Sequence, residues 1–229
     1  MAARLLRDGH HLALVQRGDV DPGLRVAAET AGRRVTVHRA DLTEPAAARA
    51  AVEEAADAHG RLDALVLNAG RIDRHPAADF PLDVWEATLA LNLTSPFVMA
   101  QTAARRFMAQ GSGGRIVFVA SVLAFQGGIL VPAYAATKGA VRQLVMALAN
   151  EWAAEGIGVN AVAPGYVETE LTSALRADPE RSAALGARIP AGRWAQPEDV
   201  AGAVAYLCSP DAAYVHGQTL PVDGGWLGR

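Results

Sequence analysis

The sequence predicts a doubly wound α/β fold, in which helices cover both faces of a mainly parallel sheet. Two observations lead to this prediction. Short apolar runs alternate with longer segments whose apolar residues recur at helical spacing, and the short runs are apolar throughout. Strands of that kind are buried on both faces, which is typical of a parallel sheet between two helix layers. With 229 residues and no repeats or linker-like tracts, the chain is predicted to form a single domain over residues 1–229.

The expected elements follow one another in a regular order. Gly9 ends a short helical segment at the start, Gly60 ends a later helix, and Pro197 suits the first turn of the last one. The expected strands are HLALVQ (11–16), RVTVHR (34–39), LDALVLNAG (62–70), GGRIVFVAS (113–121), GVNAVAPG (158–165) and QTLPVDGG (218–225), and the expected helices cover 24–30, 43–60, 82–108, 132–154 and 197–207. The least regular stretch, 169–194, is interpreted as a flap over a functional site.

Composition excludes several classes of function. The net charge is −3 and no basic tract is interleaved with aromatic residues, so a nucleic-acid partner is not expected. No apolar stretch reaches the roughly 18 residues of a membrane span, and the first residues lack the apolar core of a secretory signal. A cytoplasmic location is therefore predicted. The single cysteine, Cys208, lies in an apolar run and is expected to be buried, and the six histidines have no metal-ligand spacing.

Ligands of doubly wound sheets bind beyond the carboxyl ends of the strands. That rule selects the residues directly after each expected strand as candidates for a binding site. They are Gln16, Arg17, Asp41, Asn68 to Gly70, Ser121 and Pro164 to Thr169.

The stretch YAATK is the strongest local signal for chemistry. Tyr134 and Lys138 are four residues apart in a helical segment, so they share one face, and Ser121 ends the strand before that helix. A tyrosine with a pKa near 10 is a poor base at neutral pH, but a nearby cation favours its phenolate. Lowering that pKa by about 3 units needs about 4 kcal/mol, which an ammonium together with a cationic cofactor ring can supply. Taken alone, the same two residues also fit an ordinary solvated pair.

The set of motifs resembles the short-chain dehydrogenase/reductase family. Ser121, Tyr134 and Lys138 occur together with NAG at 68–70, LNL at 91–93, PG at 164–165 and VDGG at 222–225, in the family's order and spacing. The resemblance implies a Rossmann-like fold and an NAD(P)-dependent oxidoreductase.

The resemblance also implies a role for each catalytic residue. Tyr134 would be the general acid and base, Ser121 would hold the reacting oxygen, and Lys138 would bind the nicotinamide ribose and lower the tyrosine pKa. Asn92 would position a water linking Lys138 to solvent, although an amide that satisfies a helix irregularity at this position is compatible with that role.

The cofactor-binding residues follow from the same resemblance. Asp41 would contact the adenine, residues 68–70 would pass the adenosine ribose, and the PGYVET segment would hold the nicotinamide carboxamide. The implied cofactor-binding set is Gln16, Arg17, Asp41, Leu42, Asn68, Ala69, Gly70, Tyr134, Lys138, Pro164, Gly165, Val167 and Thr169. In this fold an acidic residue at the end of the family's second strand, which corresponds to the strand at 11–16 here, selects NAD. Gln16 stands at that position, and Arg17 could pair with a 2′-phosphate. The subfamily resemblance favours NAD, and NADP stays open.

Four longer segments resemble a subfamily that oxidises deoxy sugar acids. They are SVLAFQGGILVPAYAATK, NEWAAEGIGVNAVAPGYVETE, LRADPERSAALGARIPAGRW and DGGWLGR. The implied reaction interconverts a secondary alcohol and a ketone on a substrate of the 2-dehydro-3-deoxy-D-gluconate type. Its carboxylate needs a cation, for which Arg176, Arg188 and Arg193 are candidates, while Gln126 could bind a sugar hydroxyl. Each of these four side chains also has an ordinary structural interpretation.

Two other functions stay open. A reductase of 3-oxoacyl thioesters belongs to the same family, and a pseudoenzyme would keep the fold and assembly surfaces without binding a cofactor. The resemblance also implies a homotetramer formed through the two long helices and the C-terminal strand.

The beginning of the chain lacks a strand and glycine-rich loop that the family places first. In the strand order 3-2-1-4-5-6 that strand is central and its loop holds the pyrophosphate. We therefore expect the natural start to lie upstream of Met1, and cofactor binding by the 229-residue chain to be impaired. A stable fold would otherwise require that the strand at 11–16 pair directly with the strand at 62–70, or that another segment fill the gap.

Overall fold

The computed structural model describes all residues from Met1 to Arg229 and has the predicted layered α/β architecture. Its strands are β1 (Leu12–Gln16), β2 (Val35–Arg39), β3 (Ala64–Leu67), β4 (Gly114–Val119), β5 (Ile157–Pro164) and β6 (Thr219–Val222). Its helices are α1 (Ala2–Arg7), α2 (Pro22–Thr30), α3 (Pro45–His59), α4 (Leu82–Leu89), α5 (Ser95–Gln110), α6 (Pro132–Trp152), α7 (Ser173–Arg176), α8 (Pro179–Arg188) and α9 (Pro197–Cys208). No helix has both the length and the apolar character needed to cross a membrane.

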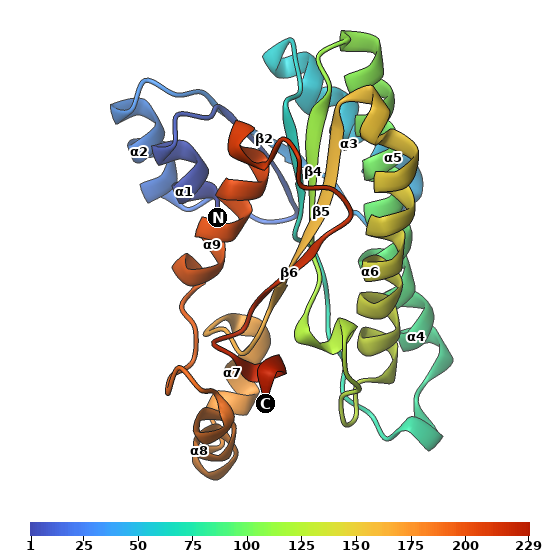
Figure 1. The fold of residues 1–229 in the computed structure, drawn as a ribbon, viewed down its shortest axis with the longest axis vertical. Helices are drawn as coiled ribbons and strands as arrows, with labels where there is room; N and C mark the ends of the chain where they lie inside the picture. Colours follow the sequence, from blue (N-terminus) through green and yellow to red (C-terminus); the bar gives the residue numbers. More distant parts are fainter.

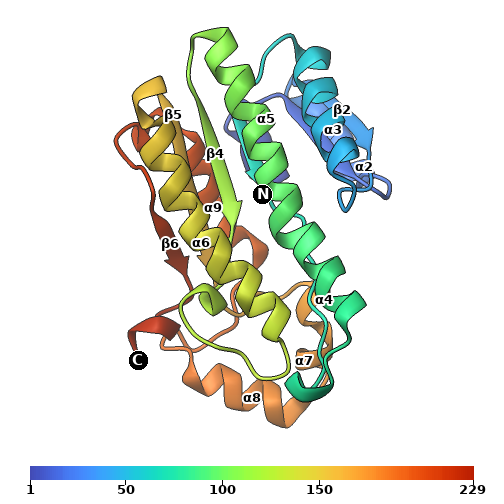
Figure 2. The same cartoon turned by 90° about the vertical axis from the view of Figure 1, so that its right-hand side faces the viewer.

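Four strands form the main sheet in the order β3-β4-β5-β6, and every pairing is parallel. Helices α5 and α6 cover one face and α9 covers the other (Figures 1 and 2). Along β4, Ile116 and Phe118 pack toward α5 and α6, whereas Val117 between them packs with the residues of α9. Because successive side chains of a strand point to opposite faces, an uninterrupted apolar run fills both layers, as the sequence predicted.

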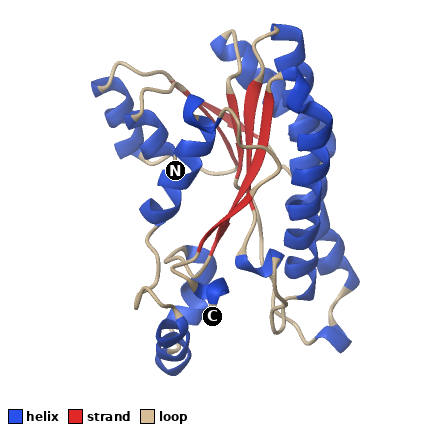
Figure 3. Ribbon diagram, in the orientation of Figure 1, coloured by secondary structure: helices blue, strands red, loops and turns tan.

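The strands β1 and β2 form a separate two-stranded parallel sheet, which is a departure from the expected arrangement. We expected β1 either to pair directly with β3 or to be joined to it by another segment, and the structure contains neither. The pair lies apart from the main sheet in Figure 2, and Figure 3 shows it among the helices near the N-terminus; it is held by α1, α2 and α3. Leu6, Leu12 and Ala28 form a small core of their own there, and α1 packs against α9. Burial of helix side chains thus holds the pair in place without a backbone ladder between β1 and β3.

A π-helical turn, Ala90–Thr94, joins α4 to α5 inside the long helix predicted from Leu82 onward. The irregularity considered for Asn92 therefore exists, since Asn92 lies in the middle of this turn. Such turns insert one extra residue per turn and frequently occur at functional sites. Here the turn directs a buried amide away from the helix toward the loop after β3.

The 169–194 segment contains α7 and α8 and packs onto the body of the protein through aromatic residues. Trp194 and Trp226 are both buried, and Tyr166 stacks edge-on against them with ring centroids 5.3 Å and 4.7 Å away. Figure 1 shows α7 and α8 at the end of the molecule that also holds the C-terminus, beyond the carboxyl ends of β5 and β6. The segment therefore lies on the side where a doubly wound sheet binds its ligands.

Candidate active site

Ser121 directly follows β4, and its side chain is fixed by the turn that it caps. Its Oγ accepts a hydrogen bond from the Leu123 amide at 3.2 Å, at the start of a short 3₁₀ turn. That turn packs against the first residues of α6, where Tyr134 and Lys138 lie one helical turn apart. All three side chains are buried, so the pair at 134 and 138 is not an ordinary solvated pair.

Lys138 is buried beneath the tyrosine ring. Its Nζ donates a hydrogen bond to the Val119 carbonyl at 2.6 Å and lies 5.5 Å from the centroid of the Tyr134 ring. Burial without an anionic partner lowers the pKa of the ammonium from 10.5 to about 8. At neutral pH the group is still mainly charged, and it can give up its proton at a mildly alkaline pH.

Burial raises the pKa of the Tyr134 phenol above its ordinary value of 10. The neighbouring Ser121 hydroxyl and the positive charge of Arg74 offset part of this rise. This is a correction to the expectation that Lys138 would lower the tyrosine pKa, because Lys138 is not among the groups that lower it. Desolvation of the phenolate outweighs the cation in the protein alone, so the phenol is neutral at pH 7.

Asn92 fixes the loop that follows β3. Its Oδ1 accepts from the Arg71 amide and its Nδ2 donates to the Arg71 carbonyl, both at 2.9 Å. A Cβ added at Gly70 would lie 3.3 Å from the Asn92 Oδ1 and 3.9 Å from the Lys138 Nζ. The loop, the π-turn and the lysine therefore meet at this glycine, where only a residue without a side chain fits comfortably.

Seven of the predicted cofactor-binding residues line one cavity of about 810 Å³. These seven follow β1, β2 and β3, and they are Gln16, Arg17, Asp41, Leu42, Asn68, Ala69 and Gly70. Asp41 accepts hydrogen bonds from the amide and hydroxyl of Thr43, which lower the pKa of its carboxyl. The Gln16 amide donates to the Gly18 carbonyl at 3.1 Å. A space of this size beside polar strand ends fits the adenosine half of a dinucleotide.

The other six predicted cofactor residues lie outside that cavity: Tyr134 and Lys138 are on α6, and four lie at or after the end of β5. Pro164 ends the strand, and a Cβ at Gly165 would lie 2.8 Å from the Asp223 Cα, so glycine is required by close approach of backbone. Val167 is buried and pairs with Ala195 in an isolated bridge, and Thr169 caps the next turn. These residues lie at the carboxyl end of β5, as the nicotinamide half of a dinucleotide would require.

The residues described above fit the adenosine and nicotinamide ends of a dinucleotide better than they fit the pyrophosphate between them. Gly9 and Gly70 are the only glycines that line the cavity, and they stand at opposite ends of the parallel strands. A run of backbone amides from neighbouring glycines, which would hold a pyrophosphate, is not formed by these two residues.

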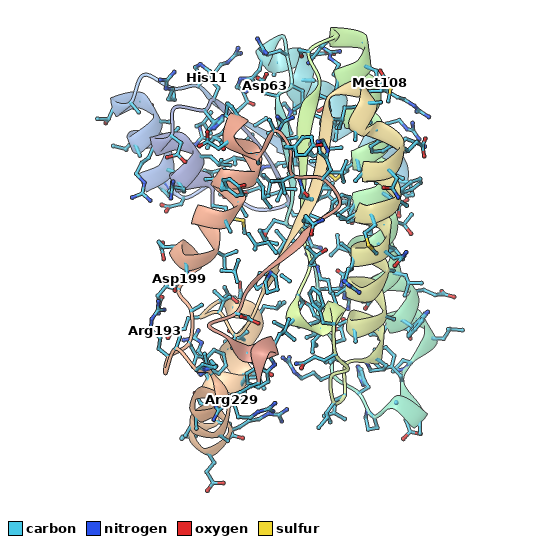
Figure 4. The ribbon with its side chains drawn as sticks, viewed as in Figure 1. His11, Asp63, Met108, Arg193, Asp199 and Arg229 are labelled. Carbon is cyan, nitrogen blue, oxygen red and sulfur yellow. The ribbon has the colours of Figure 1, made fainter.

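The three arginines expected to bind a substrate carboxylate are engaged elsewhere. Arg193 forms a bidentate pair with Asp199 at 2.7 Å and 2.9 Å, and its hydrogen bonds hold the pKa of that carboxyl at about 2 (Figure 4). Arg188 stacks 4.0 Å above the centroid of the Trp226 ring, and Arg176 lies 3.8 Å from the Glu168 carboxylate. Gln126 is half-buried in the loop after Ser121.

Arg74 is a candidate that the sequence reasoning missed. Its loop is pinned on one side by Asn92 and on the other by a hydrogen bond from the His75 amide to the Leu130 carbonyl at 2.9 Å. The side chain is half-buried, forms no ion pair, and is close enough to Tyr134 to favour its phenolate. A basic residue shortly after the NAG motif was the available signal, but only the fold brings it to the tyrosine.

The comparisons with known proteins define the class. The family described as "Enoyl-(Acyl carrier protein) reductase" matches residues 1–227, and the chain belongs to the short-chain dehydrogenase/reductase family. The resemblance inferred from the motifs is thereby confirmed.

Particular relatives share a narrower name. The 2-dehydro-3-deoxy-D-gluconate 5-dehydrogenase of Pseudoalteromonas atlantica is 48% identical over 198 residues, covering 86% of this chain and 78% of the relative. The protein of the same name from Escherichia coli is 44% identical over 232 residues, covering 98% and 92%. A solved gluconate 5-dehydrogenase from Burkholderia cenocepacia, in complex with NADP and tartrate, has a TM-score of 0.92 and 38% identity, covering 100% of this chain and 89% of that one.

Proposed function

We propose that this protein is an NAD(P)-dependent dehydrogenase that interconverts a secondary alcohol and a ketone on a deoxy sugar acid of the 2-dehydro-3-deoxy-D-gluconate type. The observation that carries the proposal is the buried cluster of Ser121, Tyr134 and Lys138 at the carboxyl end of β4. The names of the relatives support the substrate class.

The chemistry requires a proton and a hydride to leave the alcohol together. A bound nicotinamide would accept the hydride from the carbon during oxidation and return it during reduction. Tyr134 takes the hydroxyl proton during oxidation and donates it to the ketone oxygen during reduction, while the Ser121 hydroxyl holds that oxygen. The neutral phenol produced by burial is the form needed for reduction.

Lys138 and Asn92 support the role of Tyr134 without touching the reacting atoms. The ammonium, held by the Val119 carbonyl, would bind the nicotinamide ribose, and together with a bound cationic nicotinamide ring it would supply the positive charge that favours the phenolate during oxidation. Asn92 holds the loop at Gly70 and positions a water beside Lys138. The 169–194 segment covers the substrate in this arrangement.

Arg74 is the cation that we propose for the substrate carboxylate. It lies beside Tyr134 without a carboxylate partner of its own, whereas Arg176 and Arg193 are each paired with an acidic side chain. An ionised hydrogen bond contributes about 1.5–3 kcal/mol, which corresponds to about a 10- to 150-fold change in KM.

The test compares Arg74→Ala with Arg193→Ala on the acid and on a neutral alcohol analogue. We expect Arg74→Ala to raise KM for the acid alone, and Arg193→Ala to change neither KM much. A larger effect of Arg193→Ala would restore the candidate chosen from the sequence. Equal effects of Arg74→Ala on both substrates would overturn the assignment, and turnover of a 3-oxoacyl thioester in preference to both would favour the reductase.

The cofactor preference depends on the end of β1. The sugar-acid resemblance favours NAD. However, the Gln16 side chain donates its hydrogen bond to the nearby Gly18 carbonyl, and Arg17 is exposed beside it. We propose that Arg17 allows NADP to bind as well. Calorimetric titration should show that Arg17→Ala weakens NADP and leaves NAD unchanged, and an equal loss for both would refute this role. Absence of binding to either would favour the pseudoenzyme.

We also propose that the protein is a cytoplasmic homotetramer that associates through α5 and α6. Phe97 is partly exposed on α5 and lines a shallow apolar hollow with Leu93, Ala140, Leu144 and Ala147. Such patches on helices commonly mark subunit contacts. Light scattering of the wild type and of Phe97→Asp distinguishes a tetramer from a monomer.

A further inference from the structure

Leu130 is the only residue other than glycine whose backbone is left-handed, with a φ of 67°. It lies in the loop that leads from Ser121 to the first turn of α6. The left-handed region crowds the Cβ of an L residue, so glycine, asparagine or aspartate normally occupies such positions. Gly127 and Gly128 lie just before it in the chain, and neither has a positive φ. The loop therefore places its least favourable backbone conformation on a leucine, although two glycines are close by.

Burial of the side chain does not explain this conformation. Leu130 is 38% exposed, and the preceding Ile129 is 82% exposed. By contrast, Gly128 is tightly packed, since a Cβ there would lie 2.6 Å from the Val131 side chain and 2.8 Å from that of Leu123. A strained residue persists where the surrounding structure holds it, and such residues cluster at functional sites. What holds Leu130 is therefore a contact of its backbone.

The Leu130 carbonyl accepts a hydrogen bond from the His75 amide at 2.9 Å. This bond joins the loop before α6 to the loop after β3, and both loops lie at the same end of the molecule beside α6 (Figures 1 and 2). The loop after β3 is also held at Arg71, by the side chain of Asn92. Arg74 lies between these two anchors and directly precedes the second one. A shift of His75 must therefore move Arg74 as well.

The position of Arg74 depends on the backbone of its loop. Its side chain takes part in no salt bridge, yet it is close enough to Tyr134 to favour the phenolate. The His75 ring packs edge-on against Phe80 at a centroid distance of 5.3 Å, and Phe80 packs against Trp85 of α4 at 6.5 Å. These rings fix the loop on the side of α4, and the Leu130 carbonyl fixes it on the side of α6.

We propose that Leu130 is a positioning residue for the binding of the substrate carboxylate. Its left-handed backbone turns its carbonyl toward the His75 amide, and the resulting bond keeps Arg74 beside Tyr134. The proposal rests on the role proposed above for Arg74, and it adds what holds that guanidinium near the reacting oxygen. A residue branched at Cβ is strongly disfavoured in the left-handed region, whereas asparagine tolerates it. The first kind of residue should release the loop, and the second should keep it in place.

Amide hydrogen exchange of His75 tests the backbone part of the proposal without any turnover. Leu130→Asn allows the left-handed region, Leu130→Ala disfavours it, and Leu130→Val disfavours it most. We expect the His75 amide to exchange at least about tenfold faster in Leu130→Val, at an intermediate rate in Leu130→Ala, and within about twofold of the wild type in Leu130→Asn. Ile129→Val is the matched control, because it shortens the neighbouring exposed side chain at a residue whose φ is not positive.

Steady-state kinetics test the consequence for Arg74. Leu130→Val should raise KM for the sugar acid by at least about threefold and change kcat less, because neighbouring residues that act on one contact are coupled to this extent. KM for a neutral alcohol analogue should stay unchanged, and Leu130→Asn should restore KM for the acid. In the presence of Arg74→Ala, Leu130→Val should have less than about a twofold further effect, since both changes remove the same contact.

Several outcomes would overturn the proposal. One is unchanged exchange of the His75 amide in Leu130→Val, and another is a Leu130→Asn variant that behaves like Leu130→Val. Equal effects of Leu130→Val on the acid and on the neutral alcohol would overturn it too, because the change would then not act through Arg74. If Arg74→Ala has an acid-specific effect and Leu130→Val has none, this inference alone fails. If Arg74→Ala itself has no acid-specific effect, the role proposed for Arg74 fails and the inference fails with it.

Discussion

Lys138 is the only lysine in the chain, so its ionisation can be followed without interference from another ammonium side chain. It is 5% exposed, and its pKa falls from 10.5 to about 8 because burial disfavours the charged form. A shift of that size corresponds to roughly 3 kcal/mol by which the charged lysine destabilises the folded state below pH 8. Between pH 8 and 10.5 the unfolded chain binds more protons at Lys138 than the folded chain does. The ionisation of Lys138 therefore makes the free energy of unfolding rise with pH across that window.

The substitution Lys138→Met measures this contribution, because it keeps an apolar side chain of similar length and removes the charge. At pH 7 we expect the free energy of unfolding of the variant to be about 2–3 kcal/mol higher than that of the wild type. This value allows about 1 kcal/mol for the lost hydrogen bond to the Val119 carbonyl. The difference should shrink as pH rises from 8 to 10.5. Other titrating groups are common to both proteins and cancel in the difference.

Two measurements check this reasoning. Urea unfolding at pH 7, 9 and 10.5 gives the difference in free energy, and ¹³C-labelled lysine gives a single NMR signal whose titration reports the pKa directly. A midpoint near 10.5 would refute the reasoning, because it would show that the buried ammonium is not desolvated. A Met variant that is less stable than the wild type at pH 7 would refute it as well.

Two further substitutions have outcomes set by contacts in the structure. Asn92→Ala removes both bonds to the Arg71 backbone and leaves those partly buried groups unpaired, so we expect about 2–4 kcal/mol of destabilisation by urea unfolding, together with loss of activity. A loss of less than 0.5 kcal/mol, within the ordinary range of about ±0.5 kcal/mol for surface substitutions, would mean that water replaces the amide. Gly165→Ala brings a methyl group within 2.8 Å of the Asp223 Cα and should cost about 1–3 kcal/mol. Gly139→Ala is the matched control, since its added methyl meets nothing within 4 Å and the helix should gain up to about 1 kcal/mol. Equal thermal shifts for the two glycine variants would contradict the close approach.

The cluster of Ser121, Tyr134 and Lys138 was predictable from sequence because its spacing is enforced by local structure. Tyr134 and Lys138 share a helix face whatever the rest of the protein does, and Ser121 ends a strand whose apolar run is unmistakable. The helix irregularity at Asn92 was considered in advance, but its partner, the Arg71 backbone, is 21 residues away and becomes visible only in the fold.

An arginine for the substrate carboxylate was not predictable in the same way. Arg176, Arg188 and Arg193 were selected by their segment, but a guanidinium binds whichever anion or ring lies nearest, and the fold supplies Glu168, Trp226 and Asp199. Arg74 was overlooked because its closeness to Tyr134 depends on how the loop after β3 packs against the loop before α6.

The sequence by itself determined the layers, the order of the elements and the choice of candidate reacting groups, because apolar periodicity and short-range spacing act within a few residues of each position. The tertiary structure decided whether the two sheets join, which arginine is free, and whether Tyr134 is charged. Each of these depends on desolvation and on backbone pairing between segments far apart in the chain. The energies involved come from contacts that no single stretch of sequence contains.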